Sequence, residues 1–373
     1  MSTSSDTVWH KLPEPFFVLA PMEAVTDVVF RHVVARASSP DLWFSEFTNA
    51  TGWVHAGDKA IRGRLFKTAD EQPIIAQIWG GEPGDMEQLA RHCKELGFDG
   101  IDINMGCPVK SAVKSGGSGL IRKPDVAIAA ITAAKTAGLP VSVKTRIGYS
   151  TVSEWQEWLT ILLQQDIAAL TLHLRTKKEM SKVPAHFELI DAIKTLRDDV
   201  SPDTPLIING DILDRAHGEE LAAKHGVDGI MIGRGVFMNP FCFAPYPKYE
   251  YKRVTSGGAA PTSENISDFS EGGADQMAGP ASSEATYESY VTRDDASGNK
   301  ALSPHKNRLI DLLYFHLDEF DRYQPQMGLP FETLKRFFKI YIRDFDGASA
   351  LRDQLMRCNS TDEVRRVLHH TML

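Results

Sequence analysis

The sequence predicts a (β/α)8 barrel over residues 15–246, followed by a small helical domain. Before residue 246, short apolar segments alternate with helical stretches, which is typical of a parallel sheet covered by helices. Several of these segments are apolar throughout, as strands buried on both faces usually are. A polar and acidic stretch then separates this part from a C-terminal part with helical patterns.

Eight strands are predicted, and helical stretches such as 85–98 and 124–138 separate many of them. Eight β segments with helical spacers fit a barrel in which each strand is followed by a helix. An open doubly wound sheet is the alternative, but no GxGxxG motif follows the first strand, so a dinucleotide-binding fold is not expected. The predicted strands are 16–22, 42–47, 73–80, 100–106, 140–148, 169–175, 205–211 and 229–235.

Composition excludes several classes of protein. The chain has 373 residues, of which 42% are hydrophobic and 24% charged, and these are ordinary values for a globular protein. No apolar run approaches the roughly 20 residues that span a bilayer, and the polar N-terminus lacks the apolar stretch of a secretory signal. The four cysteines are scattered without CxxC spacing, so neither a zinc site nor a redox pair is indicated. We therefore expect a cytoplasmic protein without a metal, and a monomer.

The net charge of −8 is unevenly distributed along the chain. Residues 255–300 carry eight acidic and two basic side chains, so the total charge does not exclude a polyanionic partner. This segment is rich in Ser, Gly and Ala and poor in large aliphatic residues, and such a composition cannot offset the entropy cost of ordering. A disordered linker is therefore expected, with an interaction tail as the alternative. The predicted organisation is a flexible N-terminus (1–14), a barrel (15–246), a linker (247–303) and a helical domain (304–373).

Polar side chains follow the carboxyl ends of the predicted strands, which is the face where barrel enzymes place their active sites. The last two strands end in IINGD and MIGRG. Their glycines let backbone N–H groups approach phosphate oxygens, and Arg234 can add a charge-assisted clamp. The pattern indicates a phosphorylated cofactor or substrate, although a glycine at a strand end is also common in a tight turn.

Six motifs at these strand ends resemble, in the same order, those of the flavin-dependent tRNA-dihydrouridine synthases. The resemblance is close over residues 19–243 and less distinct in the helical tail from Asn307. It implies a barrel enzyme that reduces the carbon 5–carbon 6 double bond of specific tRNA uridines, with FMN as cofactor and NADPH, or NADH, as the electron source. The motifs are LAPMEAVTD (19–27), INMGCPVKSAVKSGGSGLI (103–121), SVKTRIG (142–148), HLRT (173–176), INGDI (208–212) and MIGRG (231–235).

The resemblance implies that Cys107 donates the proton to carbon 5. A thiol with a pKa near 8.5 is mostly protonated at neutral pH and can serve as a general acid. Lys144 would stabilise the reduced flavin, and it lies in an apolar strand where an unpaired cation is costly. The implied flavin-binding residues are Pro21, Met22, Gln77, Lys144, His173, Asn209, Gly210, Asp211, Gly233 and Arg234. Gln77 and Asn104 suit either the flavin edge or the uracil edge, and Arg146 suits either a substrate or a phosphate contact. The predicted substrate-binding residues are Asn104, Lys110, Lys114, Arg146 and Arg175.

Each of these roles has a structural alternative. Cys107 is otherwise a small buried hydrophobe, Lys144 a partner in a salt bridge, and His173 a core histidine. Asp211 is expected to act through a backbone contact or a charge pair rather than to touch phosphate with its carboxylate. The glycine-rich loop after Cys107, with its two lysines, is expected to close over an extruded base, with a solvated flexible loop as the alternative.

The C-terminal part contains four amphipathic helical patterns and resembles the helical domain with which this family binds tRNA. Four cations, Lys335, Arg336, Lys339 and Arg343, recur at 3–4 spacing and are predicted to form one basic stripe, unless they are an ordinary solvated face. The predicted helices are 307–323, 330–345, 346–358 and 361–373.

The sequence leaves two other functions open. The main alternative is a flavin-dependent barrel oxidoreductase that acts on a small molecule, like dihydroorotate dehydrogenase, and the third is a non-catalytic RNA-binding barrel. The sequence does not identify the uridine that is modified. Leu174 stands where the family usually has glycine, so the shape of the loop 177–182 is left open.

Overall fold

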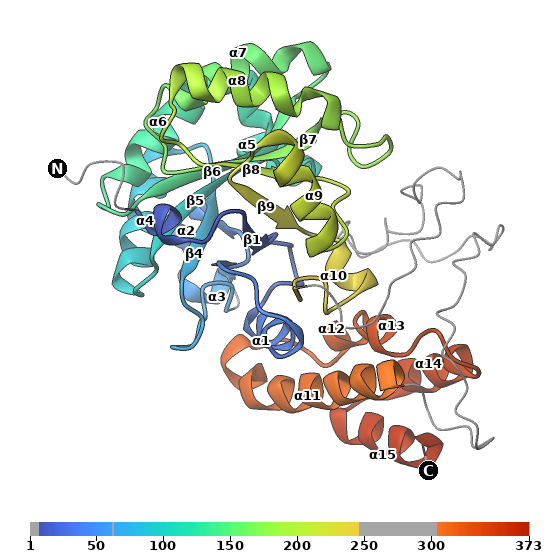
Figure 1. The fold of residues 1–373 in the computed structure, drawn as a ribbon. Coiled ribbons are helices and arrows are strands. Elements are labelled where there is room, and N and C mark those ends of the chain that lie inside the picture. Colours follow the sequence, from blue (N-terminus) through green and yellow to red (C-terminus); the bar gives the residue numbers. More distant parts are fainter. Residues whose placement is uncertain (1–6, 62, 246–303, 373) are drawn as a thin grey trace.

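The computed structural model of the protein describes residues 7–61, 63–245 and 304–372. In this part of the chain, parallel strands form one sheet in the order β1, β9, β8, β7, β6, β5, β4 and β2, and a short β3 pairs with β4. A parallel bridge between Val18 and Leu42 joins β1 to the residue before β2, so the sheet closes into a barrel (Figure 1). The strands are β1 (Phe16–Leu19), β2 (Trp43–Phe44), β3 (Thr48–Asn49), β4 (Ile74–Trp79), β5 (Gly100–Met105), β6 (Val141–Gly148), β7 (Leu170–Thr176), β8 (Leu206–Asn209) and β9 (Gly229–Ile232).

The predicted (β/α)8 barrel is confirmed, and each of the eight predicted strands is present. Most strands are shorter than predicted, because the predicted segments run into the loops that carry the polar residues. β1, for example, ends at Leu19, and Pro21 beyond it has no N–H to donate to a neighbouring strand. No sequence pattern predicts the two-residue β3, which extends the sheet beyond β2 at the carboxyl end of β4.

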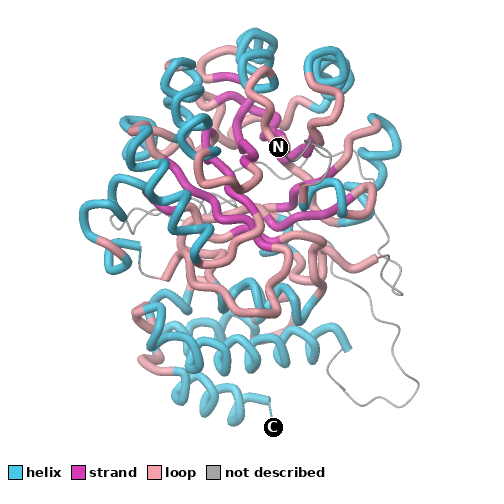
Figure 2. Tube along the Cα trace, turned by 90° about the vertical axis from the view of Figure 1, so that its left-hand side faces the viewer, coloured by secondary structure: helices cyan, strands magenta, loops and turns pink. Residues whose placement is uncertain are grey.

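Helices surround the strands of the barrel (Figure 2). Their first residues follow ordinary capping chemistry, because Asp27 and Asp214 cap α1 and α9 through their carboxylates and prolines open α4 and α6. The helices of the barrel are α1 (Val28–Ala37), α2 (Ala50–Ala56), α3 (Asp58–Ile61), α4 (Pro83–Glu95), α5 (Lys110–Ser115), α6 (Pro124–Lys135), α7 (Trp155–Leu163), α8 (Ile190–Val200), α9 (Arg215–His225) and α10 (Gly235–Met238).

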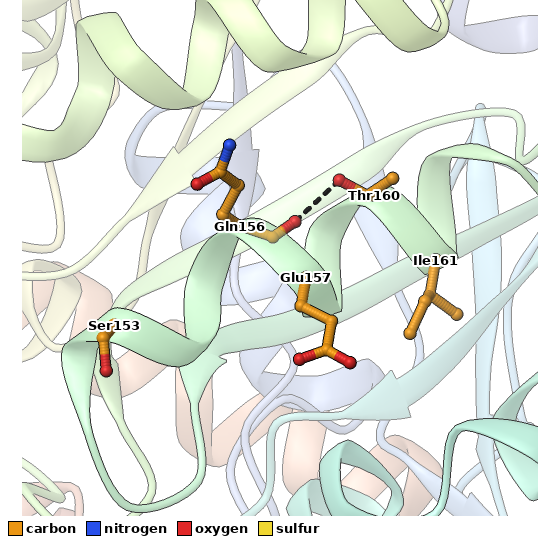
Figure 3. Close-up of a pocket in the computed structure, with 5 residues that line it drawn as sticks. All are labelled: Ser153, Gln156, Glu157, Thr160 and Ile161. Atoms are coloured by element: carbon orange, nitrogen blue, oxygen red, sulfur yellow. Dashed lines mark hydrogen bonds between the residues drawn. The ribbon is translucent and has the colours of Figure 1, made fainter.

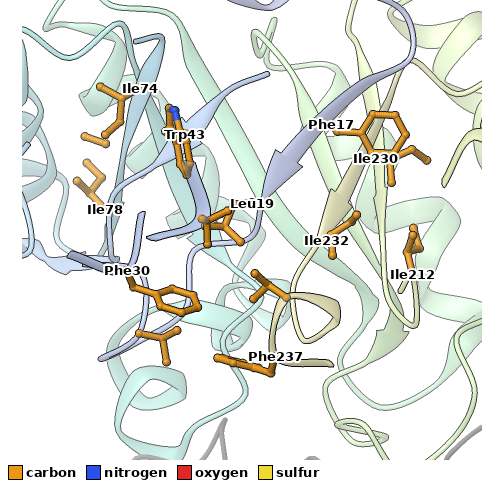
Figure 4. Packing of buried hydrophobic residues seen from close by; sticks show 14 of the residues in the cluster. Phe17, Leu19, Phe30, Trp43, Ile74, Ile78, Ile212, Ile230, Ile232 and Phe237 are labelled. Atoms are coloured by element: carbon orange, nitrogen blue, oxygen red, sulfur yellow. The ribbon is translucent and has the colours of Figure 1, made fainter. Parts of the chain in front are cut away.

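Side chains of β1 alternate between two hydrophobic clusters, as the pleat of a strand requires. Phe16 lies in the smaller cluster inside the barrel, whereas Phe17 lies in the larger cluster beneath the helices (Figure 4). Trp9 is buried in the smaller cluster, with its ring centroid 6.0 Å from that of Phe16 and 6.1 Å from that of Phe44. Burial of Trp9 orders residues 8–11 as a 3-10 helix, although they fall within the N-terminus predicted to be flexible.

Five helices are described after residue 303, and the first of them packs against α1 (Figure 1). The pattern over 330–345 forms two short helices in place of the single helix predicted there. The chain turns at Phe337, whose ring stacks on Phe30 of α1 with centroids 4.9 Å apart. These helices are α11 (Pro304–Met327), α12 (Glu332–Lys335), α13 (Phe338–Tyr341), α14 (Ala348–Arg357) and α15 (Thr361–Met372).

Two of the four cations predicted to form a basic stripe instead dock the C-terminal helices onto the barrel. Arg336 Nη1 donates to Ala24 O at 3.0 Å, in the loop after β1. Arg343 Nη1 donates to Met238 O at 2.8 Å, at the end of α10. The four side chains therefore do not share one free face, because the helix that would align them is broken and half of them face the barrel.

The C-terminal helices and the outer layer of the barrel share one continuous hydrophobic cluster. A buried polar contact crosses the same boundary, where His32 Nδ1 lies 2.5 Å from Glu319 Oε2. This packing fixes the helices relative to the barrel. The predicted linker (247–303) lies outside the described residues, and the predicted domain boundaries stay a prediction.

Candidate active site at the barrel mouth

The carboxyl ends of the strands bring the predicted site residues to one mouth of the barrel. The strand register places Asn104 beside Lys144, Arg146 beside His173, and His173 beside Asn209. The predicted residues are Pro21 and Met22 after β1, Gln77 on β4, Asn104 and Cys107 at β5, Lys144 and Arg146 on β6, His173 and Arg175 on β7, Asn209, Gly210 and Asp211 at β8, Gly233 and Arg234 after β9, and Lys110 and Lys114 on α5.

Cys107 lies in a turn that hydrogen bonds hold at both of its backbone groups. Asn104 Oδ1 accepts from the N–H groups of Gly106 at 3.0 Å and of Cys107 at 2.9 Å. Ser118 donates its N–H (3.0 Å) and its hydroxyl (2.8 Å) to Cys107 O. Burial raises the pKa of the Cys107 thiol, so the half-buried thiol is protonated at neutral pH and can act as an acid.

The glycine-rich segment after Cys107 is helical, and its second half is buried. It forms α5 and then a 3-10 helix over Gly117–Arg122, and residues 116–121 are buried. Gly117 has a φ of +52°, and a Cβ on it would lie 3.0 Å from Cys107 O, so only glycine fits there without strain. The segment therefore supports the Cys107 turn, and its two lysines, Lys110 and Lys114, are exposed on α5.

Four cations gather at the mouth, and among the described residues only Asp211 forms ion pairs with any of them. They are Lys144, Arg146, Arg175 and Arg234. Burial and the charge of Arg146 lower the pKa of Lys144 to about 8, and burial lowers the pKa of Arg146 to about 10. An excess of buried positive charge is unfavourable by itself, and a bound anion would offset it.

Asp211 forms ion pairs with two of these cations, Arg175 and Arg234. Its Oδ2 accepts from Arg175 Nη2 and from Ala185 N (2.9 Å), and its Oδ1 accepts from Arg234 Nη2 at 3.1 Å. Burial acts to raise the pKa of Asp211, but the hydrogen bond and charge of Arg175 outweigh it and lower that pKa below its usual value. The carboxylate thus orients Arg234 toward one position after β9.

His173 is neutral, and its tautomer follows from its neighbour. Burial and the charges of Arg146 and Lys144 hold the pKa of His173 well below its usual value. Arg175 Nη1 lies 3.3 Å from His173 Nε2, and because a guanidinium only donates, the ring proton is on Nδ1. Gly210 makes room for the ring, since its φ is +119° and a Cβ on it would lie 3.0 Å from His173 Cδ2.

Arg146 and Arg175, which were predicted to bind substrate, are buried and donate to backbone carbonyls. Arg146 Nε donates to Gly106 O at 2.7 Å and its Nη1 to Met180 O at 3.0 Å. Arg175 Nε donates to Val183 O at 2.5 Å. The two guanidinium groups therefore tie the Cys107 turn and the loop after β7 to the barrel mouth, and few of their donors remain for a ligand.

Leu174, which replaces the family's usual glycine, does not reach the mouth. Its side chain is fully buried in the layer beneath the helices. The following loop takes its shape from Glu179, which accepts from Thr176 N at 2.7 Å and lies 3.0 Å from His186 Nε2. Because Leu174 is buried in the outer layer, only its neighbours on β7 contribute side chains to the mouth.

Seven exposed or half-buried cations lie in the segments that follow β5 and β7, and none makes an ion pair with a described residue. Arg122 and Lys177 each lie 5.1 Å from the ring centroid of Tyr149, which follows β6. On the flank of the barrel, by contrast, Lys135 and Lys194 pair with aspartates. The seven rim cations are Lys110, Lys114, Arg122, Lys123, Lys177, Lys178 and Lys182.

The sequence patterns assign no role to two buried carboxyl groups near the mouth. Asp102 lies on β5, and burial raises its pKa to about 6. Glu46 follows β2, burial and the charge of Asp27 raise its pKa to about 8, and its Oε1 has no hydrogen-bond partner among the described residues. A carboxylate within a buried strand is costly unless it is partnered, and this signal could have drawn attention to Asp102.

Other features of the surface do not compete with the mouth as a site. A hollow on the solvent side of α7 is lined by Ser153, Gln156, Glu157, Thr160 and Ile161 (Figure 3), and no strand-end residue contributes to it. Within the described residues, no group of three or more His, Cys, Asp and Glu side chains is placed to hold a metal ion. The described helices include none that is long and apolar enough to cross a membrane.

Comparison with known proteins identifies the family. A family model described as dihydrouridine synthase matches residues 18–266. The "Probable tRNA-dihydrouridine synthase 2" of Bacillus subtilis (strain 168) is 50% identical over 366 residues, which cover 98% of this chain and 96% of the relative. A "Probable tRNA-dihydrouridine synthase" of Staphylococcus aureus (strain COL) is 46% identical over 365 residues, which cover 97% of this chain and 95% of the relative. The chain therefore belongs to the dihydrouridine synthase family.

Proposed function

We propose that the protein is a tRNA-dihydrouridine synthase, which reduces the carbon 5–carbon 6 double bond of specific tRNA uridines with FMN and NADPH. The observation that carries this proposal is a mouth with four buried or half-buried cations, one paired carboxylate and a protonated thiol. Such a mouth suits an anionic cofactor beside an acid. The names of the two relatives support the same substrate.

The chain's residues at the mouth fit FMN. Arg234, held by Asp211, and the backbone N–H groups of Gly210 and Gly233 offer donors for a phosphate. Lys144 supplies a positive charge where a reduced flavin would carry a negative one. When bound and reduced by NADPH, FMN supplies the two electrons of the reaction.

Cys107 Sγ holds the proton that carbon 5 of the uracil receives. In that step the S–H bond breaks and a C–H bond forms at carbon 5, so the sulfur is left as a thiolate. The charges of Arg146 and Lys144 act at this sulfur and favour its thiolate, which assists departure of the proton. A proton from solvent then restores the thiol.

The rim cations and the C-terminal helices supply the surface for tRNA. Seven cations without ion pairs offer partners for phosphates, and release of condensed counterions would favour binding. Exposed apolar side chains follow three strand ends, Val109 after β5, Val183 after β7 and Leu213 after β8, so ligands at the mouth would also bury apolar surface. We assign Lys110 and Lys114 to tRNA contact, residues 304–373 to a second contact region, and a monomer to the active form.

The test follows the flavin absorbance of the holoenzyme in two steps. NADPH should bleach the flavin without tRNA, and tRNA that lacks dihydrouridine should restore the colour while mass spectrometry detects dihydrouridine in the RNA. Cys107→Ala should still bind flavin and tRNA but reduce uridine about a hundredfold more slowly or worse, whereas Cys93→Ala, at a buried cysteine of α4, should not. Reoxidation by orotate but not by tRNA would favour a small-molecule oxidoreductase instead.

A further inference from the structure

A chain of hydrogen bonds runs inside the barrel from Asp102 to the Cys107 turn. Asp102 Oδ2 accepts from Gln77 Nε2 at 2.7 Å, and Gln77 Oε1 accepts from Asn104 Nδ2 at 3.0 Å. Asn104 Oδ1 then accepts from the backbone N–H groups of Gly106 and Cys107, at 3.0 and 2.9 Å. Asp102 and Gln77 are fully buried, and Asn104 is 6% exposed. Three side chains on two neighbouring strands thus connect a buried carboxyl group to the backbone of the proposed acid.

The direction of this chain is fixed at both of its ends. At the Cys107 end, backbone N–H groups can only donate, and at the other end an ionised carboxylate can only accept. The amides of Gln77 and Asn104 can each lie in two orientations, but only one orientation of each satisfies every contact. A reversed Asn104 would set its NH2 group against the N–H of Cys107, and buried donors would lose their acceptors.

The surroundings of Asp102 exclude direct contact between its carboxylate and a ligand at the mouth. Its Oδ1 accepts from the hydroxyl of Ser142 at 2.7 Å, and Lys144 on the same strand as Ser142 is the charged group that acts on it. Its carboxylate has no exposed surface, so it cannot touch a ligand. Burial of an ionisable group is unfavourable, and here both of its oxygens are used to orient polar neighbours.

We infer that Asp102 is a positioning residue for the proton transfer, which orients the amides of Gln77 and Asn104 and through them holds the Cys107 turn. The inference rests on the proposed role of Cys107 as the acid. Asp102 itself exchanges no proton with the substrate and acts only through the two amides. Without it, the Gln77 amide is free to reverse, Asn104 can follow, and, among the described residues, the Cys107 turn is held only by Ser118 and Arg146.

Three variants at the same depth in the barrel separate this role from ordinary packing. Asp102→Ala removes the acceptor that starts the chain. Asp102→Asn keeps it, because the asparagine oxygen can accept from Gln77 while its NH2 group donates to the Ser142 hydroxyl, which lies 3.3 Å from Ile101 O as an alternative acceptor. Ser142→Ala is the matched control, since it removes one hydrogen bond from the same carboxylate but none from the chain to Cys107.

Two readouts are measured on each holoenzyme. The first is the rate of flavin reoxidation by tRNA, compared with the rate of flavin reduction by NADPH, which does not need the thiol. The second is the rate at which iodoacetamide alkylates Cys107, followed by peptide mass spectrometry. This second rate reports the turn alone, because Cys93, Cys242 and Cys358 are buried and no turnover is involved.

We expect Asp102→Ala to lower the rate of flavin reoxidation by tRNA about 10- to 100-fold and to leave the rate of flavin reduction by NADPH unchanged. The rate of Cys107 alkylation should rise several-fold. Asp102→Asn and Ser142→Ala should stay within about threefold of the wild type in both readouts. Wild-type values in Asp102→Ala, or an equal loss in Asp102→Ala and Asp102→Asn, would overturn the inference. A wild-type enzyme that tRNA does not reoxidise would refute the proposed function instead, and the alkylation rates would still test the Cys107 turn.

Discussion

We expect Lys144 to make the affinity for FMN depend on pH, and the size of the effect follows from the lowered pKa of its side chain. Burial and the charge of Arg146 lower the pKa of Lys144 to about 8. Roughly 90% of the side chain is then protonated at pH 7 and roughly 10% at pH 9. If the protonated form is the one that binds the anionic cofactor, the dissociation constant of FMN should rise about tenfold between pH 7 and pH 9.

The measurement is quenching of flavin fluorescence by the apoprotein from pH 6.5 to 9, with circular dichroism to verify the fold at each pH. Lys144→Met should bind FMN more weakly at pH 7 and lose the dependence on pH, because the methionine side chain carries no ionisable group. Cys107→Ala should keep the dependence, which separates lysine from thiol. A flat wild-type profile, or a Lys144→Met profile with the wild-type slope, would refute the role given to Lys144.

Three further predictions follow from the same mouth. The pKa of Asp102, about 6, lies above its ordinary 3.8, so the fold favours the protonated form and loses stability as pH rises through this range. Asp102→Asn should therefore raise the free energy of unfolding by about 3 kcal/mol at pH 8 but not at pH 3.5. Denaturant titrations measure this, and equal stabilities of the variant and the wild type at pH 8 would contradict it. Arg234→Ala should weaken FMN binding about 10- to 100-fold, the loss of a charged hydrogen bond, and a variant purified with full flavin would count against the phosphate assignment. Arg122→Ala and Lys177→Ala should each reduce the slope of log affinity for tRNA against log salt by about 1, whereas Lys194→Ala, whose cation is already paired, should leave the slope unchanged.

The barrel was predictable because burial on both faces leaves a direct mark on a strand's sequence. The strand Leu206–Asn209 is buried throughout, and its mostly apolar composition indicates this burial before the neighbouring strands are known. The mouth residues were predictable for a related reason, since parallel strands that close into a barrel present their carboxyl ends on one side. The partners of Arg146 and Arg175 were not, because a guanidinium can reach any of several loops and only the folded backbone decides which carbonyl it meets.

The C-terminal helices show a second limit of sequence patterns. Residues 330–345 have the spacing of one amphipathic helix, but the spacing contains no information about Phe30, on which Phe337 stacks. Tertiary packing broke the helix and turned part of the basic stripe toward the barrel. For Asp102 the sequence did contain a signal. The reasoning that singled out Lys144 as a costly charge in an apolar strand applies equally to Asp102. Its partner Gln77 was not predictable, because Gln77 comes from another strand.

Three protonation states at the mouth share one electrostatic cause. Burial lowers the pKa of Lys144 and of His173 and raises that of Cys107. At the thiol, Lys144 and Arg146 act against burial, because positive charge favours the thiolate. An anion bound beside Lys144 would cancel part of that positive charge, so it would raise the pKa of the thiol further and keep the lysine protonated. An anion that balances the charge of the mouth would therefore also keep Cys107 in the protonated form that the proposed proton transfer requires.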